Sequence, residues 1–429
     1  MSEAVKTTIV NQRTGESCIR IDHPSGMPIF VWEKPGYKSS YAVFATKYGS
    51  IDNIFDIGGQ RTEVPAGIAH YLEHKLFENE DCDAFAQYAK TGASANAYTS
   101  FDRTAYLFSC TGDIRPSLKI LLNFVQDPYF TAETVAKEQG IIAQEIQMCN
   151  DSPARCVLYN LLEAMYHLHP IKIDIAGTLE SIAEITPELL YGCYNQFYNL
   201  RNMALAVAGN VTADQVLEIA DKLLKPAGEF KLERAVIAEP PEVVKARVEQ
   251  AMPVAAPLFY LGFKYPAAGN ACVEATPMAA AAVLLELLAG KSSALYARLM
   301  AEGLINPSFG SEFFDGPGYG VWLFAGESRD PDAVAAAVHQ EIAQLRRDGI
   351  DEELFAEARN ALYGRMTASL NDVENCGDIL ISDYFYGREP FGYLDAAAAL
   401  TVNDVAAMLA ENLYPEQASL SIIKPIGND

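Results

Sequence analysis

The sequence predicts an α+β protein of two similar domains, with helices packed on one face of each sheet. At 429 residues, the chain exceeds what one ordinary hydrophobic core organises. Half of the residues are hydrophobic, which is enough for two packed cores. Strand-like and helix-like segments recur in the same order in the two halves, and their irregular alternation is typical of α+β layers.

Each half is expected to contain two strands, a helix, a strand pair and then further helices. In the first half these are 26–31, 41–45, a helix starting near Pro65, strands within 94–109, and helices to 148. In the second half they are 252–254, 258–263, a helix over 276–289, strands within 308–325, and helices to 366. Proline suits the first turn of a helix, because its missing N–H has no intrahelical partner there.

The match between the halves is sharpest where residues 130–133 and 350–353 begin equivalent helices. On that register Glu145 aligns with Arg365, and Glu138 aligns with Ala358. The second half has no histidine pair at the corresponding place. We therefore expect the second domain to be a duplicated unit without a metal site.

The boundary between the halves is expected near Pro240. The segment 224–246 is rich in proline, mixed in charge and poor in apolar periodicity, which is typical of a linker. The predicted domains are residues 1–239 and 240–429, with the linker at about 225–245.

The helix after Pro65 carries the run His70-Tyr71-Leu72-Glu73-His74. Residues i and i+4 share one helix face, so both imidazoles can reach one metal ion. The order H-x-x-E-H is the reverse of the H-E-x-x-H run that is common in zinc proteases. Random placement gives on the order of 0.01 such matches in a chain of this length. The alternative is a buried helix whose histidines only satisfy local hydrogen bonds.

A third ligand is available on the helix predicted over 131–149, whose apolar face is expected at Val135, Ile141, Ile142 and Ile146. A catalytic zinc ion takes three protein ligands and keeps one position open. Glu138 and Glu145 stand seven residues apart, so they share a face of this helix.

Together, this motif and the two downstream glutamates resemble the pitrilysin or insulinase (M16) metallopeptidases. The resemblance implies that His70, His74 and Glu145 bind one zinc ion, that Glu73 is the general base, and that Glu138 is an accessory catalytic carboxylate. The alternative for Glu138 is an exposed helix charge. The family also implies two domains of the LuxS/MPP-like kind, each a mainly antiparallel sheet with helices on one face, which face each other across a cavity.

The run Gly92 to Ser100 adds to the resemblance. In the M16 family this stretch is an edge strand to which a peptide substrate adds through main-chain hydrogen bonds. The resemblance therefore implies substrate binding at Ala95, Asn96, Ala97 and Tyr98. The alternative is an ordinary strand with a small-residue bend.

The second half departs from the family pattern. M16 enzymes usually place an arginine and a tyrosine in this domain, but Met300 and Asn306 stand at the matching positions. The pattern resembles the zinc-bearing subunit of paired bacterial M16 proteins, the elongation factor P aminopentanol modification-associated type. It implies a zinc endopeptidase that acts with an M16 partner carrying the Arg/Tyr pair, or as a homodimer. The alternative is a non-catalytic assembly subunit.

Net charge and cysteine content limit which binding partners and which cellular compartment are expected. The net charge of −24 disfavours nucleic acid and anionic membranes, because phosphate binding needs clustered lysine and arginine. Eight scattered cysteines without a C-x-x-C pair suit a reducing cytoplasm, and the N-terminus does not read as a targeting segment. The most apolar stretch, 278–290, is predicted to be a buried helix. His167 and His169 precede Pro170 in a predicted loop and are expected to be structural.

Overall fold

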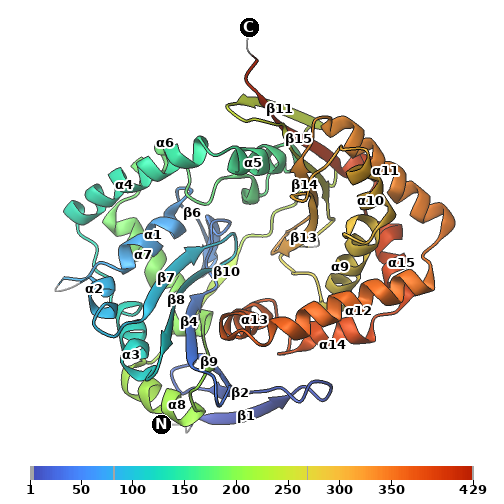
Figure 1. Cartoon of the computed structure of the whole chain (residues 1–429). Coiled ribbons are helices and arrows are strands. Elements are labelled where there is room, and N and C mark those ends of the chain that lie inside the picture. The colour runs from blue at the N-terminus through green and yellow to red at the C-terminus, as the bar shows by residue number, and fades with distance from the viewer. Residues whose placement is uncertain (1–3, 81–82, 268, 428–429) are drawn as a thin grey trace. The chain divides into compact units, whose positions relative to one another are not determined.

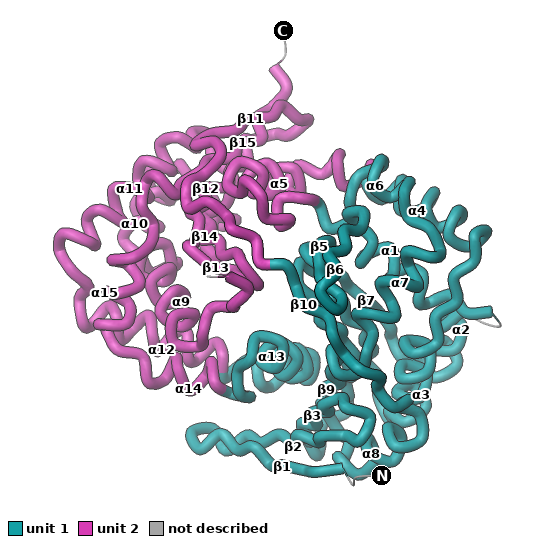
Figure 2. Tube along the Cα trace, turned by 180° about the vertical axis from the view of Figure 1, so that it is seen from behind, with its two compact units in different colours: residues 1–146, 174–235, 367–391 teal, residues 147–173, 236–366, 392–429 magenta. Residues whose placement is uncertain are grey.

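The computed structural model describes residues 4–80, 83–267 and 269–427, which form two compact units (Figure 2). Unit 1 consists of Met1–Ile146, Asp174–Ala235 and Thr367–Phe391. Unit 2 consists of Gln147–Ile173, Val236–Met366 and Gly392–Asp429. Both units combine a sheet with packed helices, which confirms the predicted α+β class.

The main sheet of unit 1 has seven strands in the order β1-β2-β3-β9-β4-β8-β7 (Figure 1). The strands are β1 (Val5–Val10), β2 (Ser17–Asp22), β3 (Pro28–Glu33), β4 (Ser39–Thr46), β7 (Ser94–Thr99), β8 (Thr104–Thr111) and β9 (Met203–Gly209). Only the β3–β9 pair among them is parallel. A small antiparallel sheet joins β5 (Ile54–Ile57), β6 (Gln60–Glu63) and β10 (Leu232–Arg234). Strand β7 therefore lies at an edge of the main sheet.

The helices of unit 1 enclose its core against the main sheet. They are α1 (Ile68–Leu76), α2 (Ala84–Tyr88), α3 (Arg115–Phe124), α4 (Ala132–Asn150, which continues into unit 2), α6 (Leu179–Ala183), α7 (Pro187–Phe197), α8 (Ala213–Leu223) and α13 (Val373–Phe385). A short 3₁₀ turn, η2 (Leu200–Asn202), precedes β9. The core includes Phe44 from β4, Phe108 from β8 and Leu72 from α1, all fully buried. Burial of these side chains is the main force that fixes α1 against the sheet.

Unit 2 repeats this plan with a five-stranded sheet in the order β11-β15-β12-β14-β13. The strands are β11 (Arg247–Met252), β12 (Leu258–Lys264), β13 (Gly310–Gly316), β14 (Tyr319–Glu327) and β15 (Ala418–Pro425), and only β11–β15 is parallel. The helices are α5 (Pro153–Met165), α9 (Ala275–Ala289), α10 (Ala294–Ala301), α11 (Pro331–Asp348), α12 (Glu352–Ser369, which continues into unit 1), α14 (Gly392–Ala399) and α15 (Val402–Glu411). The 3₁₀ turns are η1 (Pro170–Lys172) and η3 (Pro415–Gln417).

The apolar helix α9 lies in the core of unit 2. The segment Ala275–Ala301 is long and apolar enough to cross a membrane by length and composition, but 56% of its most apolar window is buried inside the structure. Val283, Leu284 and Leu288 pack into the same cluster as the sheet residue Phe263. This packing agrees with the buried helix that the sequence predicts.

The strand registers show that the two sheets are built alike. In unit 1, Thr46 of β4 pairs with Met203, the first residue of β9. In unit 2, Phe263 of β12 pairs with Ala418, the first residue of β15. Strands β9 and β15 both begin directly after a 3₁₀ turn. Strand β4 therefore corresponds to β12, and β9 corresponds to β15.

Each sheet also carries a helix on its second face, and that helix comes from the other half of the chain. Helix α13 packs on β4 and β9 in unit 1, and α5 packs on β12 and β15 in unit 2. The prediction of helices on one face therefore omitted one helix per sheet. The chain crosses between units at 235/236, inside the expected linker, but the compact units also exchange 147–173 and 367–391 and so are not contiguous.

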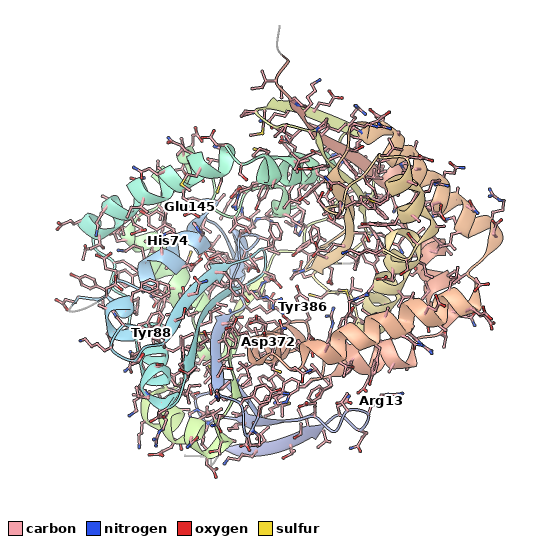
Figure 3. The ribbon with its side chains drawn as sticks, viewed as in Figure 1. Arg13, His74, Tyr88, Glu145, Asp372 and Tyr386 are labelled. Carbon is pink, nitrogen blue, oxygen red and sulfur yellow. The ribbon has the colours of Figure 1, made fainter. Side chains whose placement is uncertain are left out.

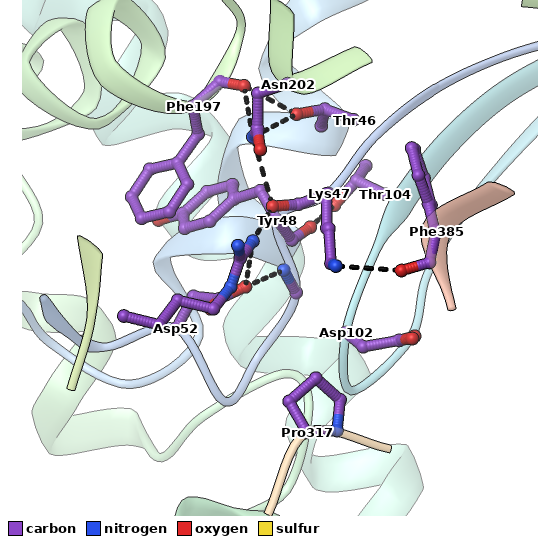
Figure 4. Close-up of polar contacts among 12 residues, drawn as sticks. Thr46, Lys47, Tyr48, Asp52, Asp102, Thr104, Phe197, Asn202, Pro317 and Phe385 are labelled. Atoms are coloured by element: carbon purple, nitrogen blue, oxygen red, sulfur yellow. Dashed lines mark hydrogen bonds and ion pairs between the residues drawn. The ribbon is translucent and has the colours of Figure 1, made fainter. Parts of the chain in front are cut away.

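A lysine at the same register position caps each exchanged helix. Lys47 follows Thr46, and its Nζ donates to the carbonyl of Phe385, the last residue of α13, at 2.8 Å (Figure 4). Lys264 follows Phe263, and its Nζ donates to the carbonyl of Met165, the last residue of α5, at 3.1 Å. A cation is favourable at a helix C-terminus, where carbonyls lack intrahelical partners.

Lys264 belongs to a buried ion pair that fixes the end of α5. Its Nζ lies 2.7 Å from Glu239 Oε1, and both side chains are at most 8% exposed. Glu239 accepts three further hydrogen bonds from the backbone N–H groups of 167–169, at 2.7–2.8 Å. Burial opposes ionisation of Glu239, but the lysine and the three N–H donors lower its pKa.

Replacing Lys264 by methionine is expected to destabilise unit 2 by about 3–5 kcal/mol, because the Glu239 carboxylate would stay buried without its cation. The measurement is urea unfolding, followed by hydrogen exchange of the β12 and β14 amides. Lys424→Met is the matched control. Its ammonium pairs with Glu249 at 2.6 Å but is 53% exposed, so the expected cost is below about 1 kcal/mol. Equal effects of the two variants would contradict the role assigned to Lys264.

Candidate metal centre

Helix α1 is held at its start by a close backbone contact. Gly67 caps the helix with φ 87°, a left-handed conformation that favours glycine. A Cβ at this position would lie 2.4 Å from the carbonyl oxygen of Ala176. Ser181 Oγ also donates to the Ala66 carbonyl at 2.8 Å. The first turn, which carries His70, is therefore fixed against the segment 176–181.

Helix α4 is placed by its buried residues and by one bond to α1. Val135, Ile142 and Ile146 are buried, as predicted, whereas Ile141 is 46% exposed and does not belong to the apolar face. Tyr71 Oη donates to the Val135 carbonyl. This hydrogen bond joins α1 to α4, the two helices that carry the predicted ligands.

The structure brings the three predicted ligands together. His70 Nε2 lies 3.5 Å from Glu145 Oε1, and His74 Nε2 lies 3.5 Å from Glu145 Oε2. One ligand atom from each residue lies within 4.8 Å of the other two. Figure 3 shows His74 and Glu145 on neighbouring helices. Among the described residues, this is the group of histidine, cysteine and acidic side chains that could hold a metal ion.

The donor set fits a zinc ion in chemistry and in spacing. Ligands at roughly 2.0–2.2 Å from a tetrahedral ion stand roughly 3.3–3.6 Å from one another. The two 3.5 Å separations match that spacing without movement of α1 or α4. His70 is 8% exposed, and its Nδ1 is a buried atom without a hydrogen bond among the described residues.

Glu138 contacts the second imidazole from the side opposite Glu145. His74 Nδ1 lies 2.9 Å from Glu138 Oε1. Burial opposes the charged form of His74, but Glu138, Glu73 and Glu145 outweigh it and raise the pKa of the imidazole. The bond from His74 also lowers the pKa of Glu138. A carboxylate in this position orients a ligating histidine and fixes its tautomer. Glu138 is thus not a free surface charge.

Glu73 points to the end of the edge strand. Its Oε2 accepts a hydrogen bond of 2.7 Å from Thr99 Oγ1. Tyr106 and Tyr198 lie near Glu73, and their hydroxyls bond each other at 2.8 Å. Burial raises the pKa of both phenols, so they stay neutral. Thr99 was not a predicted site residue, although its spacing from Ala95 and Ala97 places it on their face of the strand.

The predicted substrate strand is the edge strand β7, which among the described strands pairs with β8 alone. Ala95 and Ala97 pack toward the core, and the N–H of Ala97 donates to Asn96 Oδ1 at 2.9 Å. Tyr98 is half-buried on the same strand. A pocket of about 590 Å³ is lined by residues of α1, β7 and α4 and by residues within 77–80 and 83–85. Its lining includes Glu73, His74, Phe77, Asn96, Ala97 and Glu138.

Several other residues discussed from the sequence have local contacts, but the buried Nε2 of His167 has no hydrogen bond among the described residues. His169 is buried, and its Nε2 contacts the Pro317 carbonyl at 3.0 Å within unit 2. Burial lowers its pKa to about 4. In the repeat, Arg365 stands where Glu145 does, and its Nη2 pairs with Glu286 Oε2 at 2.8 Å. Asn306 Nδ2 donates to Glu327 Oε2 at 2.8 Å, and Met300 is 36% exposed.

Comparison with known proteins places this chain in a family of peptidases. Residues 56–179 match the model of the insulinase family, peptidase family M16. Residues 184–362 match the model of the peptidase M16 inactive domain. The chain belongs to the M16 family.

Relatives of the chain support this assignment over its whole length. It is 38% identical over 411 residues to an uncharacterised zinc protease, YmfH, of Bacillus subtilis strain 168, covering 94% of this chain and 95% of YmfH. It is similar to an M16-like protein of solved structure from Alicyclobacillus acidocaldarius, with a TM-score of 0.91, 35% identity and 99% of each chain covered. Pitrilysin shares the fold, with a TM-score of 0.77 and 18% identity over 99% of this chain and 47% of pitrilysin.

Proposed function

We propose that the protein is a zinc-dependent endopeptidase that cleaves extended peptides. The observation that carries this proposal is the cluster of His70, His74 and Glu145 beside a free edge strand. Relatives named zinc proteases support the class of activity. Two imidazoles and one carboxylate are also a typical ligand set of catalytic zinc.

In this proposal His70, His74 and Glu145 hold one zinc ion per chain. When bound, zinc supplies a Lewis acid for the scissile carbonyl and lowers the pKa of its water. Glu138 keeps the imidazole of His74 oriented through the 2.9 Å contact with Nδ1. Glu73 is not in the three-residue cluster, so its carboxylate is available to take a proton from water and return it to the leaving amine.

The edge strand suits a peptide backbone better than a compact substrate. A free edge presents unpaired N–H and C=O groups, to which an extended chain can add as another strand. Ala95 and Ala97 are small, which lets that chain approach, and Asn96 and Ala97 line the pocket beside Glu73. We propose that Ala95, Asn96, Ala97 and Tyr98 bind the substrate main chain.

We further propose that the chain is the metal-bearing half of a heterodimer, and that an M16 homologue supplies the Arg/Tyr pair. The amide of Asn306 is engaged by Glu327, and Met300 has no hydrogen-bond donor. The alternative to this heterodimer is a homodimer of the chain. We propose that the protein is cytoplasmic, because its eight scattered cysteines suit a reducing compartment. We also propose that it binds neither nucleic acid nor anionic membranes, given its charge of −24.

A non-catalytic assembly subunit is the second candidate function. It is favoured by the match of residues 184–362 to a domain described as inactive. That match lies outside 70–145, where the predicted ligands stand, so it leaves the proposed peptidase site intact.

The purified chain is expected to contain one zinc ion, and Glu145→Gln is expected to weaken zinc binding by more than tenfold, because an amide is a poorer ligand than a carboxylate. Zinc content is measured by elemental analysis, and affinity by competition with a chromophoric chelator. Glu133→Gln, in the first turn of the same helix, is the control. Full zinc occupancy of Glu145→Gln under mild chelation would show that the third ligand is wrong.

The function itself is tested by incubating a library of internally quenched peptides with the zinc-loaded chain, alone and with a co-expressed M16 homologue. Cleavage that a chelator stops and zinc restores supports the endopeptidase. A zinc-loaded pair that cleaves none of the peptides would instead favour the assembly subunit.

A further inference from the structure

Thr99 connects the candidate substrate strand to Glu73. It is the last residue of β7, and its Oγ1 lies 2.7 Å from Glu73 Oε2 on helix α1. Both side chains are half-buried within unit 1. A hydrogen bond to an ionised carboxylate is roughly twice as strong as one between neutral groups.

A second threonine lies beside the Thr99 hydroxyl but is not its nearest partner. Thr104 lies opposite Thr99 in the β7–β8 register, and the two hydroxyl oxygens are 3.5 Å apart. Thr104 is fully buried, and its Oγ1 donates to the Tyr48 carbonyl at 2.8 Å (Figure 4). Glu73 Oε2 is the nearer partner of the Thr99 hydroxyl, at 2.7 Å against 3.5 Å for Thr104 Oγ1. The single proton of Thr99 is therefore donated to the carboxylate oxygen of Glu73.

We infer that Thr99 is a positioning residue for Glu73. Its hydroxyl holds Oε2, which leaves Oε1 as the oxygen free to exchange a proton with water. Threonine suits this task because its β-branched side chain is stiff at χ1. The same bond joins α1 to β7, so the carboxylate keeps a fixed position relative to the strand that a peptide would extend.

This inference rests on the proposed peptidase function and adds a residue to it. Without the hydroxyl, Glu73 would lose one of the contacts that fix its rotamer. A displacement of about 1 Å in a reacting group can cost about 10²-fold in rate. Peptide and zinc affinities should change little, because Thr99 Oγ1 is engaged by Glu73 and bonds none of the predicted metal ligands.

The test compares Thr99→Val, which keeps the shape and removes the donor, with Thr99→Ser, which keeps the donor. Thr111→Val, an exposed change at the far end of β8, is the matched control. Each zinc-loaded protein is assayed on one internally quenched peptide that the wild-type protein cleaves. The assay uses the chain alone or the pair with the M16 homologue, whichever of the two cleaves that peptide. Zinc affinity is measured by chelator competition, and folding by thermal unfolding.

Thr99→Val is expected to lower kcat by about 10- to 100-fold, with KM and zinc affinity within about twofold of wild type. Thr99→Ser should recover most of kcat, and Thr111→Val should match wild type. A Thr99→Val enzyme with wild-type kcat would overturn the inference while leaving the peptidase proposal standing.

A readout independent of activity is the crystal structure of zinc-loaded Thr99→Val. The carboxylate of Glu73 should leave the position that it holds in wild type. If wild type cleaves no peptide, the proposed function fails first, and this structure still decides the positioning role. An unmoved Glu73 beside valine would refute that role.

Discussion

Glu73→Gln is expected to lower peptide hydrolysis by about 10²–10⁴-fold while zinc stays bound, because an amide cannot accept the proton that a general base takes. The motivation is structural: Glu73 lies beside His74 in sequence but outside the three-residue ligand cluster. The measurements are kcat on an internally quenched peptide and zinc content after dialysis.

The matched control is Glu63→Gln, an exposed change at the end of β6. It should leave both turnover and zinc content at the wild-type level. Two results would change the assignment. Near-native turnover of Glu73→Gln would remove Glu73 from the proposed mechanism. Loss of zinc together with activity would instead make Glu73 a metal ligand.

The isolated chain is expected to be a poor peptidase, and an M16 homologue that carries the Arg/Tyr pair should raise turnover by about 10²–10³-fold. A missing oxyanion donor typically costs about 3–4 kcal/mol of barrier. Met300 cannot donate a hydrogen bond, and Asn306 already donates to Glu327. Turnover of an extended peptide is compared for the chain alone and for the co-purified pair.

The informative partner variant replaces its arginine and tyrosine by methionine and asparagine, the residues of this chain. That variant should still bind but should not raise turnover. Robust activity of the isolated chain, unchanged by any partner, would mean that donors within this sequence replace the missing pair or that none is needed.

The grouping of the candidate metal ligands was predictable in part because their residues are linked by short, regular spacings. His70 and His74 are four residues apart on α1, and Glu138 and Glu145 are seven apart on α4, so helix periodicity alone places each pair on one face. The meeting of the two helices was implied by family resemblance and not by periodicity. The contact between His74 and Glu138 is a consequence of that meeting.

The details that the sequence did not reveal depend on contacts across the chain. The exposed Ile141 follows the same apolar pattern as its buried neighbour Ile142, and only the position of the neighbouring helices separates them. Thr99 is one of many threonines until α1 places Glu73 beside it. Helices α5 and α13 have ordinary apolar faces, so nothing local indicates which sheet each one covers.

The origin of α13 sets an order of events during synthesis on the ribosome. The last strand of the unit 1 main sheet ends at Gly209, yet the helix that covers the second face of this sheet is complete only roughly 180 residues later. At usual elongation rates, translation of that segment takes on the order of 10–40 seconds. During that time Phe30 and Trp32, which later contact Tyr384 and Phe391, have no covering helix. Nascent chains that stall before Phe391 should therefore be aggregation-prone clients of chaperones, even though they already contain all of the predicted metal ligands.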